Sequence, residues 1–264
     1  MSLATIVGLI VSLGLFLGAI ATATDNYGVF ISASSFIIVV GGTLAASFIS
    51  YEPRYVLLSL KLCYRIFGAP PVSRGVLKAE VGRIIKWAYI VQKSGLPALE
   101  GEAGKSVRGD VFMKFAVDIV VSGYSSDEVR TILQTTVDTT FSRNTIQVSI
   151  LRNMGAAAPA FGMIGTLVGL IIMLDSMGGD PGSLGAGLAV ALATTLYGVL
   201  FARLILLPVA DKVQQREQIV RFRNVLVAEG LVMLAERKNP RQIQDRLNSF
   251  LDPTIHFDID KVKK

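Results

Sequence analysis

Threonine hydroxyls interrupt two long apolar runs of this sequence. Residues 162–174 read GMIGTLVGLIIML and contain Thr166, and residues 188–200 read LAVALATTLYGVL and contain Thr194 and Thr195. A threonine hydroxyl in an apolar helix usually donates to the backbone carbonyl one turn back. The other interpretation is that the hydroxyls face a shared site, because neutral oxygen atoms suit a hard cation such as sodium.

Other site chemistry is nearly absent from the sequence. One His and one Cys are too few for a metal site of ordinary ligand count, and a single Cys63 excludes a disulfide within one chain. No Gly-x-x-x-x-Gly-Lys phosphate-binding sequence and no nucleic-acid motif occurs. We therefore expect no catalytic residues, no cofactor, no enzyme activity and no nucleic-acid partner.

The composition is that of a membrane protein. The 264 residues are 52% hydrophobic and 17% charged, whereas soluble proteins carry about 25% charged residues. Four apolar blocks approach the roughly 20 residues with which a helix crosses a bilayer. We expect an all-α fold with four transmembrane helices in two hairpins, over residues 3–23, 29–50, 153–174 and 184–210. No basic segment precedes the first block, so we expect a retained span and not a signal peptide.

Basic residues give these spans an orientation. Of the 26 Lys and Arg residues, none lies in the connections 24–28 and 175–183, and all but Arg203 lie in 51–152 and 211–264. Basic residues are retained on the cytoplasmic side of a membrane. We therefore expect both termini, the domain 51–152 and the tail 211–264 to be cytoplasmic.

Helical periodicity and capping signals divide the cytoplasmic segments. Ser125-x-x-Glu128 is a capping-box pattern, and Asn239-Pro240 is typical of a helix start. Gly95 and Pro97 indicate a turn. We expect helices over residues 76–91, 111–121, 127–152, 211–237 and 240–251, the third of them continuing into the third span.

The segment that follows the second span carries basic residues on one helix face. Arg54, Lys61 and Arg65 are spaced by seven and four residues within 54–67. This helix either lies in the plane of the membrane surface or simply continues the second span.

The spans lack a carboxylate at mid-depth. Asp25, Asp175 and Asp180 belong to the outer connections. Ionisable groups usually carry protons or sodium across a membrane, so another polypeptide must supply one here. Thr166 lies roughly 20 Å from the inner end of its span and Thr195 roughly 16 Å from the outer end of the next, at 1.5 Å per residue. The two hydroxyls are therefore expected at similar depth.

Two prolines stand near the inner ends of the third and fourth spans. Pro159 and Pro208 each remove a backbone hydrogen bond and kink a helix. The kinks either flex during a conformational cycle or fit neighbouring helices as static features.

Several long segments, in order along the chain, carry a family resemblance. They are MSLATIVGLI at the start, SSFIIVVGGT, KSGLPALEGE, APAFGMIGTLVGLIIML, LAVALATTLYG with LLPVADKV, and NPRQIQDRLNSFL. Over nearly its whole length the chain resembles the A subunit of the bacterial flagellar stator, the MotA/PomA family, and the sodium-type PomA more than the proton type.

This resemblance implies a rotary motor in the bacterial inner membrane that drives motility and chemotaxis. Five A subunits are expected to form a homopentamer around a dimer of a MotB/PomB-like B subunit, which has one span and a peptidoglycan-binding domain. The B span carries the Asp that this chain lacks. Ion flow is expected to turn the A ring within the lipid membrane, and its cytoplasmic charges generate torque on the switch-ring protein of the rotor.

The resemblance also implies roles for individual residues. Thr195 matches the channel-facing Thr of the fourth span, Thr166 matches a Thr of sodium-driven members, and Thr194 is a neighbour in the same ion pathway. Thr166 and Thr195 are expected to share a sodium site with the B-subunit Asp, with H+ as the alternative ion. Pro159 and Pro208 match the prolines of the family and are expected to couple conformational change.

The resemblance also implies which cytoplasmic residues contact the rotor. Lys93, Glu100 and Glu102 fall in that region, although Gln92 and Gly101 stand where other members carry charge. Ser32 and Ala156 occupy positions at which some sodium-type members carry Asp, which weakens the assignment of sodium.

Two other functions fit the residues less well. A related energiser of an outer-membrane process, ExbB or TolQ, usually has three spans, so the extra amino-terminal hairpin favours the stator. A self-sufficient secondary transporter is disfavoured because no span carries a mid-depth carboxylate.

Overall fold

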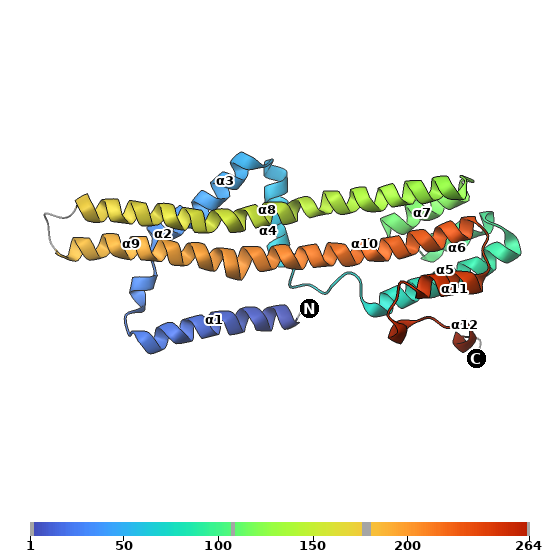
Figure 1. Cartoon of the computed structure of the whole chain (residues 1–264), viewed down its shortest axis with the longest axis horizontal. Helices are drawn as coiled ribbons and strands as arrows, with labels where there is room; N and C mark the ends of the chain where they lie inside the picture. Colours follow the sequence, from blue (N-terminus) through green and yellow to red (C-terminus); the bar gives the residue numbers. More distant parts are fainter. Residues whose placement is uncertain (1–2, 107–108, 176–180, 263–264) are drawn as a thin grey trace. The chain divides into compact units, whose positions relative to one another are not determined.

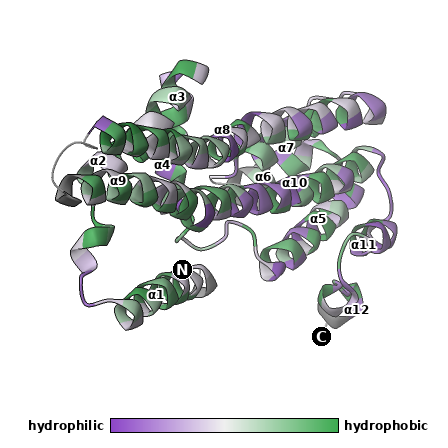
Figure 2. Cartoon of the chain, turned by 60° about the vertical axis from the view of Figure 1, so that its left-hand side comes forward, coloured by the Kyte–Doolittle hydropathy of each residue, from purple (hydrophilic) through white to green (hydrophobic). Residues whose placement is uncertain are grey.

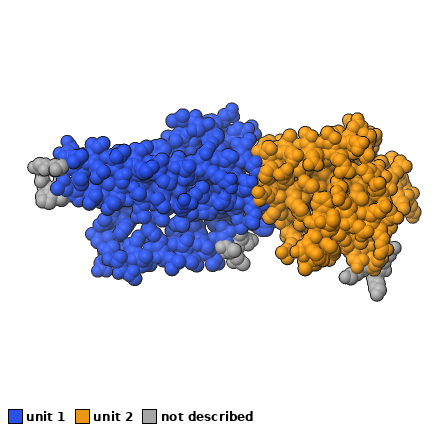
Figure 3. All heavy atoms as spheres, in the orientation of Figure 1, with its two compact units in different colours: residues 1–70, 145–215 blue, residues 71–144, 216–264 orange. Residues whose placement is uncertain are grey.

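The structure is a computed structural model that describes residues 3–106, 109–175 and 181–262. Within these ranges the chain consists of helices and connections and contains no strand, which confirms the expected all-α fold. Two compact units are distinguished in Figure 3. Unit 1 comprises residues 1–70 and 145–215, and unit 2 comprises residues 71–144 and 216–264.

Within the described ranges, four helices are long and apolar enough to cross a membrane. They cover Thr5–Ala23, Tyr27–Ser50, Ser126–Asp175 and Leu184–Ala235. Their apolar side chains are widely exposed, as for Leu15 at 72% and Ile171 at 65%. Figure 2 shows the hydrophobic character of α1 (Leu3–Ala23) and α9 (Pro181–Leu200). Exposed apolar surface of this extent suits contact with lipid or with other membrane helices.

The second span is interrupted near its start. A 3-10 turn at Tyr27–Phe30 precedes α2 (Ala33–Phe36), a π-helical turn at Ile37–Gly41 and α3 (Gly42–Ser50). Ser32 caps α2, because its side chain accepts a hydrogen bond from the backbone N–H of Ser35 at 3.3 Å. The regular helix of this span therefore begins four residues later than position 29, the start expected from hydropathy.

One uninterrupted helix joins the cytoplasmic sequence to the third span. This helix, α8 (Ser126–Asp175), has 50 residues, which corresponds to a length of about 75 Å. The predicted capping box is present at its start, where Ser125 and Glu128 exchange backbone and side-chain hydrogen bonds of 2.9 and 3.3 Å. The predicted continuation of this helix into the membrane is confirmed.

The fourth span and the following helix form a second long rod. It consists of α9, a π-helical turn at Phe201–Leu206 and α10 (Leu207–Ala235). Pro208 follows the π turn directly. A π turn widens the backbone by one residue, and this accommodates a proline that has no N–H to donate and whose ring crowds the preceding turn.

A buried core in unit 1 joins these long helices to α4 (Pro53–Arg65). Ile66 follows α4 and packs with Leu151 and Met154 of α8 and with Leu206 and Val213 of the second rod. Figure 1 shows α4 crossing the direction of α8 and α10 at a large angle.

The core of unit 2 surrounds Trp87 on α5 (Arg74–Ser94), which is 1% exposed. Helices α7 (Val111–Val121) and α11 (Pro240–Asn248) pack into the same cluster. The predicted limits of α7 agree with the structure, and Asn239 caps α11 in a capping box with Gln242.

A helix in unit 2 was missed by the sequence analysis. Where only a turn was expected, α6 covers Pro97–Ser106. Gly95 ends α5 with a φ of 80°, a conformation that glycine adopts without strain. Pro97 then begins the next helix at once, since proline is favoured at the first helical position. A short α12 (Ile259–Val262) was also not expected.

A buried ion cluster crosses the core of unit 2. The guanidinium of Arg223, which is 7% exposed, pairs with Glu80 and Asp110, and Glu80 also pairs with Arg83 at 3.2 Å. Burial lowers the pKa of Arg223, but hydrogen bonds and attraction from the two carboxylates more than offset this, and the pKa rises above its ordinary value. The cluster ties α5, α7 and α10 together.

Candidate functional site

Helices α8 and α9 pack with their backbones in direct contact. A Cβ atom added to Gly162 would lie 2.9 Å from the carbonyl oxygen of Thr194, and one added to Gly169 would lie 2.6 Å from the backbone N of Ala191. A Cβ on Gly165 would lie 2.6 Å from Oγ1 of Thr194. Small residues permit this close approach of membrane helices.

These contacts fix the register of the two antiparallel helices. Gly162 lies against Thr195 and Gly169 against Ala191, so Thr166 stands opposite the turn of α9 that lies between Ala191 and Thr195. The levels of Thr166 and Thr195 along the hairpin therefore differ by about three residues, or roughly 4.5 Å. The packing brings the two hydroxyl-bearing turns to nearly the same depth.

Each of the three hydroxyls donates to a carbonyl of its own helix. Thr166 donates to Met163 O at 2.6 Å, Thr194 donates to Ala191 O at 2.9 Å, and Thr195 makes a long contact of 3.5 Å with Ala191 O. A donating hydroxyl keeps its oxygen lone pairs. The bond to the preceding turn therefore leaves the oxygen able to bind a cation.

The three threonines differ in exposure. Thr194 is completely buried at the contact with α8, whereas Thr195 is exposed and Thr166 is half-buried. Thr194 thus fills the space between the glycines of α8, and Thr166 and Thr195 remain accessible to a neighbouring molecule. No Asp or Glu occurs in residues 153–174 or 184–210. Among the described residues, no group of three or more His, Cys, Asp and Glu side chains lies close enough to hold a metal ion.

The two prolines lie at helix contacts or irregularities. Pro159 is inside α8, and a Cβ on Gly198 of α9 would lie 3.2 Å from the Cα of Pro159. Because proline has no N–H, the i−4 hydrogen bond to the carbonyl of Gly155 is missing. Pro208 is the second residue of α10, directly after the π-helical segment Phe201–Leu206. Each long helix of the hairpin therefore has a weakened backbone ladder near the end of its span remote from the connection 175–183.

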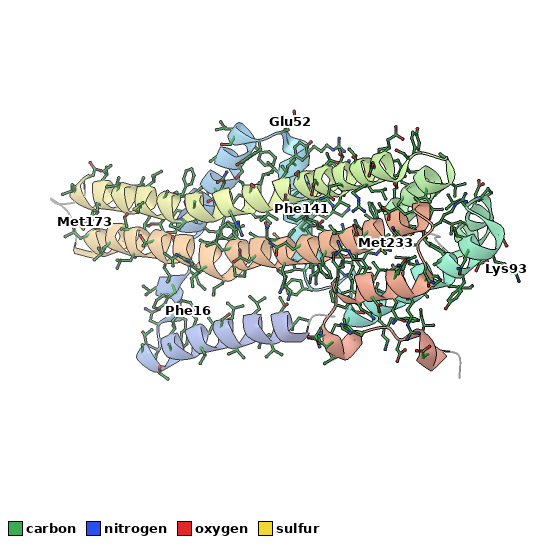
Figure 4. All side chains as sticks on the ribbon, turned by 45° about the vertical axis from the view of Figure 1, so that its right-hand side comes forward. Phe16, Glu52, Lys93, Phe141, Met173 and Met233 are labelled. Carbon is green, nitrogen blue, oxygen red and sulfur yellow. The ribbon has the colours of Figure 1, made fainter. Side chains whose placement is uncertain are left out.

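The charged residues of the 93–102 segment gather at one end of unit 2. Lys93 and Glu100 are exposed, and Figure 4 shows the Lys93 side chain pointing away from the end of α5. Glu102 is half-buried and pairs with Lys86 at 2.6 Å. The structure therefore presents one basic and one acidic side chain to the surroundings and holds Glu102 against α5.

Sequence reasoning did not single out Tyr197. Its hydroxyl accepts the backbone N–H of Ser32 at 3.0 Å and donates to the carbonyl of Phe30. Ser35 also donates to the carbonyl of Val190 at 3.4 Å. A lone tyrosine in the apolar run LAVALATTLYGVL was the available signal, because a buried phenol hydroxyl requires a polar partner.

Comparisons with known proteins agree with this architecture. The sequence model of the MotA/TolQ/ExbB proton channel family matches residues 105–223. The chemotaxis protein PomA of Vibrio alginolyticus is 32% identical over 259 residues, which cover 96% of each chain. Motility protein A of Borreliella burgdorferi is 31% identical over 254 residues, which cover 96% of this chain and 95% of the relative.

Two solved structures share the fold. A structure of C. jejuni MotAB matches with a TM-score of 0.85 at 24% identity, over 96% of this chain and 97% of the other. The flagellar MotAB stator complex from Bacillus subtilis matches with a TM-score of 0.84 at 22% identity, over 100% of this chain and 98% of the other.

The chain belongs to the MotA/TolQ/ExbB proton channel family. Relatives matched over nearly the whole chain include motility protein A and PomA, so the chain is a flagellar stator subunit, as the sequence resemblance predicted. It is a multi-pass protein of the inner membrane that belongs to an ion channel and is not an enzyme.

Proposed function

We propose that five copies of this chain surround a dimer of a single-span B subunit and rotate as ions cross the membrane. The observation that carries this proposal is the hairpin of α8 and α9, which presents Thr166 and Thr195 at nearly one level in spans that contain no carboxylate. A site of this kind is completed by an Asp on the B subunit, since neutral oxygens alone provide no group that ions can charge and discharge.

Sodium is the proposed ion, and protons are the alternative. Two hydroxyl oxygens with free lone pairs support sodium, and the similarity to PomA of Vibrio alginolyticus agrees with it. Pro159 and Pro208 are proposed to let the inner halves of the two helices bend as the site loads and empties. Thr194 is proposed to keep the hairpin closely packed, so that its neighbours stay at the surface.

The proposed orientation places both termini and the segments 51–152 and 211–264 in the cytoplasm. Lys93, Glu100 and Glu102 would then face the rotor and transmit torque to its switch-ring protein. An impermeant maleimide tests this orientation on a Tyr124→Cys variant in a Cys63→Ser background, because Tyr124 is 48% exposed. Labelling of inverted membrane vesicles alone is expected, and labelling of intact spheroplasts would reverse the orientation.

The function is tested by swimming speed in a host that lacks its own stator and carries this chain with its B subunit. Speed is expected to rise with external sodium and to persist when a protonophore collapses the proton gradient. Unchanged motility in sodium-free medium, together with loss of motility on adding the protonophore, would assign the motor to protons. Native mass spectrometry of the purified complex measures the proposed stoichiometry of five to two.

A further inference from the structure

Helix α4 has one packed face and one exposed face. Val56 and Ser59 are completely buried, and Ser59 satisfies its hydroxyl by donating to Tyr55 O at 2.8 Å. On the opposite side, Leu57 is 59% exposed and Tyr64 is 81% exposed. The packed face is held by the core of unit 1, so the exposed face is available to another molecule.

The exposed face carries all the charge of the helix. The sequence of α4, PRYVLLSLKLCYR, contains three basic residues and no acidic residue. Arg54, Lys61 and Arg65 fall within about 40° of one another on a helix of 3.6 residues per turn. All three are exposed. They form a basic stripe (Arg54, Lys61 and Arg65), and the apolar side chains of Leu57 and Tyr64 lie along one side of it.

The position of α4 along the long helices is that of a membrane surface. Its core partners include Leu151 of α8 and Ala210 of α10. Arg152 and Asp211 follow these two residues and pair at 3.0 Å. Apart from Arg203, no charged residue lies between this pair and the connection 175–183. Figure 1 shows α4 crossing both helices at a large angle, so the helix lies along the surface and does not enter the bilayer.

The connection into α4 supports the same placement. Figure 4 shows Glu52 at the turn between α3 and α4, and the neighbouring Ile49 at the end of the second span is 87% exposed. The chain thus leaves the apolar span, turns at a charged residue and continues sideways. A helix with a basic stripe beside exposed apolar side chains is typical of the interface between headgroups and acyl chains.

We propose that the exposed face of α4 binds the headgroups of anionic phospholipids. The basic stripe pairs with lipid phosphates, and Leu57 and Tyr64 enter the adjoining apolar layer. This inference rests on the proposed cytoplasmic position of α4, because the cytoplasmic leaflet attracts basic segments. In the proposed ring of five, a neighbouring copy would meet this face with a different surface, and its presence there is one outcome of the test below.

The test uses the purified stator complex with its B subunit, in detergent supplemented with either phosphatidylglycerol or phosphatidylcholine. Native mass spectrometry counts the retained lipids, and the test variant is Arg54→Gln/Lys61→Gln/Arg65→Gln. The unchanged complex is expected to prefer phosphatidylglycerol, more strongly at low salt. Each basic residue removed is expected to weaken the binding of phosphatidylglycerol about fivefold.

A matched control separates the local stripe from total charge. Lys78→Gln/Lys114→Gln/Arg143→Gln removes the same charge at exposed positions of unit 2 and is expected to leave lipid retention unchanged. Equal phosphatidylglycerol retention in the unchanged complex and the stripe variant would overturn the proposal. Loss of subunits from the stripe variant at unchanged lipid retention would instead assign this face to a second copy.

The retained lipids are counted on the purified complex, and this measurement does not require ion flow. The outcome is therefore independent of the sodium dependence of swimming and of the stoichiometry, and maleimide labelling at position 124 reports separately on the orientation. A failed lipid preference with correct labelling contradicts only the lipid proposal.

Discussion

The hydroxyl of Tyr197 on α9 accepts the backbone N–H of Ser32 at 3.0 Å, at the point where the second span becomes helical. The same hydroxyl donates to the carbonyl of Phe30. One side chain therefore satisfies both a donor and an acceptor of a backbone that has no helical partners there. In an apolar surrounding, such unpaired groups are costly.

Replacing Tyr197 with Phe removes both hydrogen bonds and leaves the shape of the side chain nearly unchanged. We expect the free energy of unfolding to fall by about 1–3 kcal/mol, because a backbone donor and acceptor that are half-buried in an apolar span are left unsatisfied. Thermal unfolding of the purified protein in detergent measures this change. Tyr89→Phe, at an exposed position of α5, is the control, and equal effects of the two substitutions would contradict the proposed role of the hydroxyl.

Gly165→Ala places a methyl group against the side chain of Thr194, where 2.6 Å separates the new Cβ from Oγ1. The hairpin has to open to admit it, and we expect a loss of about 1–3 kcal/mol, typical of overpacking. Gly14→Ala in α1 meets no atom within 4 Å and serves as a matched membrane control. If Gly165→Ala and Gly14→Ala have the same melting temperature, the contact between α8 and α9 is looser than described.

Thr166→Ala and Thr195→Ala each remove one neutral oxygen from the proposed sodium site. The sodium concentration at half-maximal swimming speed is expected to rise about fivefold for each, which corresponds to about 1 kcal/mol for one lost ligand. Thr166→Ser and Thr195→Ser are expected to restore most of the affinity. Thr22→Ala is the control, because Thr22 donates to its own helix at 2.9 Å but lies in α1. A control that shifts as far as the test variants would argue against the site.

Arg223→Met leaves the carboxylates of Glu80 and Asp110 without their shared cation inside unit 2. Breaking a buried ion pair in this way is expected to lower the free energy of unfolding by about 3–5 kcal/mol. The single Trp87 lies in the same core, so its fluorescence reports on unit 2. Arg241→Met breaks the exposed pair with Asp260 and is expected to change stability by about 0–1 kcal/mol.

Glu229 makes unit 2 sensitive to acid. Burial raises the pKa of Glu229, but hydrogen bonds from Arg246 and Arg130 more than offset this and lower the pKa overall. A carboxylate with a lowered folded-state pKa contributes stability that is present above its unfolded pKa of about 4.3 and is lost as pH falls through the folded value. Between about pH 5 and pH 3, the melting temperature read from Trp87 fluorescence is therefore expected to fall less steeply for Glu229→Gln than for the unchanged chain. Glu100→Gln, at an exposed position, is expected to keep the original slope.

The sequence alone predicted the elements that rest on local signals. Hydropathy predicted the four spans, and the capping patterns at Ser125 and Asn239 predicted the starts of α8 and α11, because these signals act within one helical turn. The helix α6 was missed since Gly95 and Pro97 indicate a turn whether or not a helix follows. Only the structure shows that Pro97 begins one.

The candidate site was predictable in part. The depths of Thr166 and Thr195 follow from counting residues along two spans, but the register of those spans depends on contacts of Gly162 and Gly169 across the hairpin. The burial of Thr194 and the bonds of Tyr197 depend on partners far away in the sequence. No local sequence pattern identifies such distant contacts, so they become visible only in the packed structure.

The continuity of α8 would give leverage to the bending proposed at Pro159. From there to Ser126 the helix extends for about 50 Å, and no second proline interrupts that arm. A swing of about 5° at the hinge moves the far tip by about 4 Å. Under this proposal, a small rotation of α8 beside Thr166 would become a movement as large as a side chain at the opposite end of the helix.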